Sequence, residues 1–202
     1  MATKQKTIGV KITTPVGRVS YPALLVPKFK YQSKTDKEYS VELLFEKGAD
    51  LSAFKKACKE ALLEVFGSEA KFPKNIQLPI RDQQELIDSL QEKDKDHSHL
   101  TPGAMFARFK TNAANGAPIV VGANMETIMD EKEIYGGCYG RANVTLKVVT
   151  IPSTKITYVT GYLSGFQKTK DGKAFGSKPD AAQMFESVKD DEESADSDSL
   201  FG

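Results

Sequence analysis

The clearest pattern in the chain is an alternation of apolar and polar residues over residues 39–46. One face carries Tyr39, Val41, Leu43 and Phe45, and the other carries Ser40, Glu42 and Glu46. A period of two residues is typical of a strand that is buried on one face only. We therefore expect a half-buried strand here, with its polar face in water.

Residues 51–66 follow a different pattern, because their apolar positions recur every three or four residues. Asp50 precedes the pattern as a candidate N-cap, and Gly67 ends it. These features predict an amphipathic helix that packs by one face, with Phe54, Cys58 and Phe66 in the core. A second, shorter helix is expected over residues 82–93, after a proline-rich loop at 71–80.

The rest of the body is strand-like. We expect strands over residues 18–26, 104–110, 118–121, 140–151 and 155–166, and a hairpin turn at residues 170–173. Pro22 limits the first of these strands to an edge, a strand start or a bulge. Short strands with a helical insertion predict a mostly β fold, an OB-like small β-barrel of five or six strands.

Charge separates the two ends of the 202-residue chain. Residues 1–37 carry a net charge of +7, whereas residues 186–202 carry −6. The last stretch is rich in Asp, Glu and Ser and has few residues to bury, so we expect a disordered acidic tail after a domain at 1–185. The residues proposed for partner contacts there are Asp190, Asp191, Glu192, Glu193, Asp196, Asp198, Leu200 and Phe201.

Few residues suit enzymatic chemistry. Cys58 and Cys138 lack metal-ligand spacing and are expected to be free thiols, and His97 and His99 are expected in a solvated loop. The common phosphate-binding, metalloprotease and nucleophile motifs are missing, so we expect no catalytic residues, metal or cofactor. The charged start and the short apolar runs predict neither export nor a membrane span, which favours the cytoplasm.

Several aromatic residues stand next to cations, as in residues 28–31, 106–110 and 139–141. Unpaired nucleic acid needs both kinds of side chain, since cations neutralise phosphates and flat rings stack on bases. Alternatively, each ring lies in the core and each cation in water. The three glycines of residues 135–141 permit either the close approach of a flat ligand or a strand bulge.

Five segments carry a resemblance to a known family: residues 14–22, 39–45, 78–82, 133–142 and 163–172, of which 135–141 is the most specific. In these segments the chain resembles bacteriophage single-stranded-DNA-binding proteins, which have an OB fold and an acidic tail. The resemblance implies a tail that occupies the empty DNA site and recruits replication or recombination proteins. Tails of that family commonly finish on an aromatic residue, whereas here Gly202 follows Phe201.

We therefore expect sequence-independent binding and protection of single-stranded DNA in the cytoplasm of an infected bacterium. The expected DNA contacts are Arg18, Tyr21, Lys28, Lys30, Tyr31, Phe106, Arg108, Lys110, Tyr135, Tyr139, Arg141, Lys168 and Lys170. One alternative is a Mg²⁺-dependent nuclease that uses Asp82, Glu85 and Asp88, or Asp130, Glu131 and Glu133. Another is a protein-interaction module or virion component whose basic end binds an acidic partner.

Overall fold

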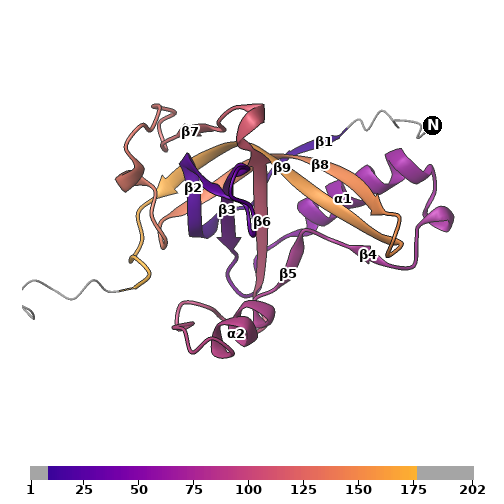
Figure 1. Cartoon of the computed structure of the whole chain (residues 1–202), viewed down its shortest axis with the longest axis horizontal. Coiled ribbons are helices and arrows are strands. Elements are labelled where there is room, and N and C mark those ends of the chain that lie inside the picture. Colours follow the sequence, from indigo (N-terminus) through magenta and orange to yellow (C-terminus); the bar gives the residue numbers. More distant parts are fainter. Residues whose placement is uncertain (1–8, 177–202) are drawn as a thin grey trace, which may run out of the picture.

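The fold was examined in a computed structural model, which describes residues 9–176 (Figure 1). The expected tail at 186–202, including its acidic residues, Leu200 and Phe201, lies outside the described residues, as does the expected domain boundary at 185. No helix within residues 9–176 is long and apolar enough to cross a membrane.

Two α-helices and nine strands make up the described chain. The helices are α1 (Ser52–Phe66) and α2 (Gln84–Gln91). The strands are β1 (Val10–Thr13), β2 (Gly17–Phe29), β3 (Lys37–Leu44), β4 (Ile76–Gln77), β5 (Ile80–Asp82), β6 (Met105–Asn112), β7 (Ile119–Val121), β8 (Tyr139–Ile151) and β9 (Ile156–Lys170).

Five of these strands close a barrel in the order β2-β3-β6-β9-β8, since β8 pairs with both β9 and β2. All neighbours are antiparallel except β6 and β9, which run parallel and pair at Lys110 and Tyr162. Both helices lie between β3 and β6 in the chain. The predicted OB-like barrel with a helical insertion is thus confirmed.

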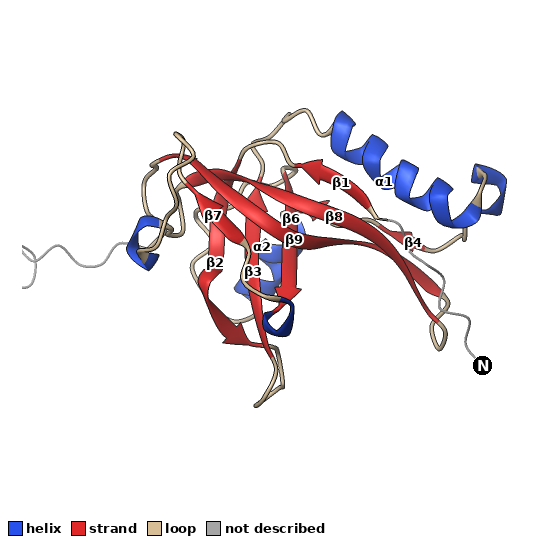
Figure 2. Ribbon diagram, turned by 90° about the horizontal axis from the view of Figure 1, so that it is seen from above, coloured by secondary structure: helices blue, strands red, loops and turns tan. Residues whose placement is uncertain are grey.

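Alternation along the strands fills the barrel. Val41 and Leu43 of β3 and Phe109 of β6 are fully buried and point inward, and the ring of Phe54 from α1 meets Phe109 edge to face. Figure 2 shows α1 beside β1 and the far part of the long β8–β9 hairpin, in agreement with its contacts to β1, β8 and β9. The helix ends at Gly67, whose φ of 79° is the left-handed C-cap conformation.

Of the three placements that Pro22 allowed, an edge, a strand start or a bulge, the structure has the bulge. β2 continues past Pro22 as far as Phe29, and its pairing with β3 shifts register between Ser20 and Ala23 and again before Lys28. Proline has no N–H to donate to the ladder. A β-bulge leaves one residue of the strand unpaired, so it accommodates a proline without the loss of a ladder hydrogen bond. Tyr21, in the first shift, has a φ of 43° and a side chain that is 61% exposed.

The prediction of a hairpin turn at residues 170–173 is wrong for the described chain. β9 ends at Lys170, and no strand follows within residues 171–176. Instead this segment returns toward the start of β8, where the Phe175 amide donates to the Gly136 carbonyl at 2.8 Å. The short strands β1, β4 and β5 were not predicted, because β4 and β5 are only two and three residues long.

Candidate functional site

The outer face of β2, β3 and β6 carries four of the predicted cations. Residues paired across antiparallel strands share a face. The register places Arg18 in one row with Leu44 and Phe106, and the following rows hold Arg108, Lys110 and then Lys28. We call this surface, defined by Arg18, Arg108, Lys110 and Lys28, the cation face. Arg108 and Lys110 thus share a face as their alternation predicts.

Two of these cations are paired with carboxylates on the same face. The Arg108 guanidinium donates from Nη2 and Nε to Glu42 Oε2 at 2.5 and 3.1 Å, and Lys110 Nζ lies 3.3 Å from Glu38 Oε2. Glu42 was expected in water but is only 2% exposed. The unmatched positive charge of the cation face therefore comes from Arg18 and Lys28.

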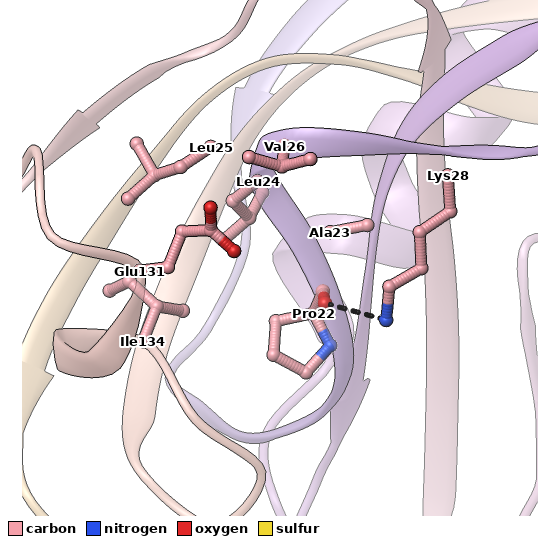
Figure 3. A pocket seen from close by; sticks show the side chains of 8 residues that line it. All are labelled: Pro22, Ala23, Leu24, Leu25, Val26, Lys28, Glu131 and Ile134. Atoms are coloured by element: carbon pink, nitrogen blue, oxygen red, sulfur yellow. Dashed lines mark hydrogen bonds between the residues drawn. The ribbon is translucent and has the colours of Figure 1, made fainter.

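Lys28 lies against the bulge of β2. Figure 3 shows its side chain beside Pro22, whose carbonyl accepts a hydrogen bond from Lys28 Nζ at 3.5 Å. The adjoining cavity of about 130 Å³ is lined by Lys28, by residues 22–26, and by Glu131 and Ile134 from the segment between β7 and β8. The bulge thus holds the Lys28 ammonium at the Pro22 carbonyl.

The turn after β2 exposes further rings and cations. Tyr31 is 90% exposed, and Phe29 is exposed with Lys37 Nζ 4.9 Å from its ring centroid. Lys30 is half-buried, and its amide donates to the Asp36 carbonyl at 2.9 Å, which closes the turn. The expected pairing of aromatic and basic residues is therefore found on the surface in this hairpin.

A second cationic surface adjoins Arg18, where β2 and β8 close the barrel. Its cleft of about 350 Å³ is lined by Arg18, Tyr139 and Lys170, with Lys47 and one carboxylate, Glu46, from the segment after β3. Lys170 Nζ lies 4.4 Å and Arg18 Cζ 5.6 Å from the Tyr139 ring centroid. We call this the Tyr139 cleft. Lys47 was not predicted, because the nearby aromatic residue, Phe45, was expected on the buried face of its strand, where it lies.

Tyr135 and Lys168 lie close to this cleft, but both side chains are bonded to Asp171. The Tyr135 hydroxyl donates to Asp171 Oδ1 at 2.8 Å, and Lys168 Nζ contacts the same oxygen at 2.7 Å. Hydrogen bonds from Lys168 and then from Tyr135 hold the pKa of Asp171 below its usual value. These two predicted contact residues therefore fix the exit of the chain from β9.

The glycines of residues 135–141 allow close approach of the chain to itself. A Cβ on Gly137, whose φ is +112°, would lie 2.2 Å from the Lys173 carbonyl oxygen, and one on Gly140 would lie 2.2 Å from Phe166 Cζ. The pairing of β8 with β9 also shifts register between Tyr139 and Gly140. The bulge reading is thus confirmed, and the segment near Gly137 is residues 173–174.

Phe106 was expected to stack on a ligand, and this prediction is wrong. Its ring is 0% exposed and packs with Leu44, Ile87 and Leu100. The reason is that α2 and the segment after it cover this end of the cation face, which Figure 1 shows below β6. The Arg81 guanidinium lies 4.8 Å from the Phe106 ring centroid and completes the cover.

Arg141 lies on another side of the barrel. Its Nε donates to Gln167 Oε1 at 2.9 Å, and it lines a cavity of about 380 Å³ together with Ile119 and Met125. The lining of this cavity includes no residue of β2, β3 or β6, so Arg141 is not part of the cation face.

The residues considered for other chemistry have local partners. Asp82 and Asp130 accept hydrogen bonds from the amides of Gln84 and Lys132, and no three His, Cys, Asp or Glu side chains gather as metal ligands within residues 9–176. Both cysteines are free, as predicted, and both are buried, which was expected of Cys58 alone; burial raises the pKa of Cys58 to about 12. His99 was expected in a solvated loop but is half-buried.

Comparison with known proteins gives one family and several solved structures. The family model described as "Enterobacter phage Enc34, ssDNA-binding protein" matches residues 10–196. No curated protein shows significant sequence similarity to the chain.

The single-stranded DNA-binding protein of bacteriophage Enc34 in complex with ssDNA has 20% identity and a TM-score of 0.61, over 86% of this chain and 97% of that chain. Another structure of the single-stranded DNA-binding protein from bacteriophage Enc34 has 21% identity and a TM-score of 0.59, over 91% and 97% of the two chains. The single-stranded DNA-binding protein gp2.5 of bacteriophage T7 has 14% identity and a TM-score of 0.59, over 92% and 98%. At these identities, the likeness to the solved structures concerns the fold.

Proposed function

The chain belongs to the family of the ssDNA-binding protein of Enterobacter phage Enc34, and from this premise we propose that it binds single-stranded DNA without sequence preference. It acts as a non-catalytic protein that coats and protects strands during phage DNA replication or recombination in the cytoplasm of the host cell. The observation that carries the proposal is the continuity of the cation face with the Tyr139 cleft through Arg18, which belongs to both.

The phosphates of the strand contact the cations of the two surfaces. Arg18, Lys47 and Lys170 converge on the Tyr139 cleft, and Lys28 extends the positive charge to the far end of β2. Each phosphate neutralised in this way releases a condensed counterion, so binding weakens as salt rises. In the wild-type protein Lys110 stays paired with Glu38, and Arg108 stays paired with the buried Glu42.

The bases stack on rings that border the same surfaces. Tyr21 and Tyr31 are exposed at the bulge and hairpin of β2, and Tyr139 lines its cleft. Each base stacked on an aromatic side chain contributes about 1–3 kcal/mol, and every base has a flat face to stack. Contacts of this kind read no base edges, which supports binding without sequence preference.

The acidic tail competes with DNA for the cation face. Residues 186–202 carry a net charge of −6 and are joined to the domain, so they compete at a high effective concentration. DNA that displaces the tail frees it to recruit replication or recombination proteins. A variant that lacks residues 186–202 is expected to bind DNA more tightly at low salt; an unchanged dissociation constant would contradict the competition.

A fluorescence anisotropy titration tests the proposed function directly. The protein is titrated into labelled oligo-dT, a mixed single strand and the matching duplex, each at about 50 and 200 mM salt. We expect tight binding to both single strands, weaker binding to the duplex and a loss of affinity at the higher salt. Equal binding to the single strand and the duplex would instead favour a general acidic-partner module.

A further inference from the structure

Phe175 occupies a slot at the covered end of the cation face. The Arg18 guanidinium carbon lies 4.3 Å from the centroid of its ring, and the His99 ring centroid lies 4.5 Å away at a tilt of 35°. Beneath it, the ring packs against the buried cluster that contains Leu44 and Phe106. The slot therefore has an apolar floor and two flat, polar neighbours, and a planar ring fills it.

Few contacts hold Phe175 in place. Its amide donates to the Gly136 carbonyl at 2.8 Å, and Arg18 Nη2 donates to the Lys173 carbonyl at 2.7 Å. Lys173, Ala174 and Gly176 are exposed, and no strand includes this segment. Segments with few buried contacts and exposed backbone open at a low free-energy cost. Phe175 can thus leave the slot while the barrel stays folded.

The neighbours of the slot match the chemistry of an unstacked base. Histidine rings and arginine guanidinium planes are groups on which splayed-out bases stack. Arg18 also lines the Tyr139 cleft, so a base in the slot would place its phosphate near Lys47 and Lys170.

We propose that the slot between Arg18 and His99 binds one nucleobase of the single strand, and that Phe175 occupies it as a substitute for the base when DNA is absent. This inference rests on the proposed function. It differs from tail competition, because Phe175 belongs to the packed domain and acts through its ring rather than through negative charge.

A Phe175→Ala variant of the 202-residue chain tests whether the Phe175 ring and a base compete for the slot. Removing the competing ring raises the fraction of protein with an open slot, so the affinity for oligo-dT is expected to rise about fivefold or more. Phe72→Ala is the matched control, since Phe72 is also partly buried and packs on Phe66 near α1, away from the slot. Thermal melting of both variants establishes that they are folded at the assay temperature.

His99→Ala in the Phe175→Ala background tests the slot itself. The Phe175→Ala substitution alone is expected to raise the affinity for oligo-dT about fivefold or more. Without the His99 ring this gain is expected to be lost, because the base loses a stacking partner. A gain that is the same with and without His99 would overturn the inference, as would an unchanged affinity of the Phe175→Ala variant.

The imidazole NMR signals provide a readout independent of affinity. The chain has two histidines, so His97, whose ring is not part of the slot, serves as an internal reference for His99. Saturating oligo-dT is expected to shift the His99 signals, as a base replaces the Phe175 ring, and to leave those of His97 nearly unchanged. If the wild-type protein binds oligo-dT but His99 does not shift, the slot is refuted and the proposed function stands. If no binding occurs, the proposed function fails as well.

Discussion

A Glu38→Gln substitution measures whether the cation face meets phosphates. Glu38 is the only acidic partner recorded for Lys110 within the described chain, at 3.3 Å, and the Lys110 side chain remains 61% exposed. The substitution removes one negative charge, keeps the shape of the side chain and leaves the Lys110 ammonium free. We therefore expect a higher affinity for single-stranded DNA and a steeper dependence on salt.

The size of the effect follows from counterion release. Each phosphate contact on a single strand adds about 0.7 to the negative slope of log K against log salt concentration. One additional contact through Lys110 should therefore make the affinity of the variant fall about 2.6-fold more than that of the wild type between about 50 and 200 mM salt. The cost in stability should be about 1 kcal/mol, because Lys110 is exposed although the Glu38 side chain is largely buried.

The assay is an anisotropy titration of labelled oligo-dT at four salt concentrations. Glu69→Gln is the matched control, because Glu69 forms a comparable ion pair with Lys59 at 2.6 Å on the side of the molecule near α1. The control should leave both the affinity and the slope unchanged. A slope for Glu38→Gln equal to that of the wild type would refute the reasoning, since Lys110 would then contact no phosphate.

Three further predictions concern the cleft and the core. Tyr139→Ala should weaken oligo-dT binding by about 1–3 kcal/mol, whereas Tyr139→Phe should retain most of it, as measured by the same titration. Phe54→Ala should lower the free energy of urea unfolding by about 3–5 kcal/mol, because its ring is buried against the barrel. Asp171 has a lowered pKa when folded, so its stabilising effect is present above its unfolded pKa of 3.8 and is lost as the pH falls through the folded value. Asp171→Asn should therefore lose less stability than the wild type on acidification below about pH 4, measured by thermal melting across a pH series.

The elements with a regular period were predictable from the sequence. The alternation over residues 39–46 and the three- and four-residue spacing over 51–66 are found as β3 and α1, because each pattern depends only on which face of one element is buried. The short strands β4 and β5 carry too few residues for a period to be recognised. Their pairing depends on β9 and β6, which lie far away in the chain.

The candidate site was predicted less completely, because its residues depend on what covers each face. Arg18, Tyr139 and Lys170 were expected from aromatic and basic neighbours, and they do meet in one cleft. The alternation of Phe106 with Arg108 predicts an outward ring, but α2 buries it, and nothing local to β6 indicates that cover.

A short ladder between β2 and β8 closes the barrel. Between β2 and β8, Gly17 pairs with Gly140 and Arg18 with Tyr139, and two backbone hydrogen bonds continue the junction from Val19 to Gly137 and Cys138. The second pair is also part of the proposed binding surface, so a bound strand that contacts both side chains would bridge the joint between the two barrel edges. Bound DNA would then stabilise the closed barrel, and the protein would melt at a higher temperature with single-stranded DNA than without it.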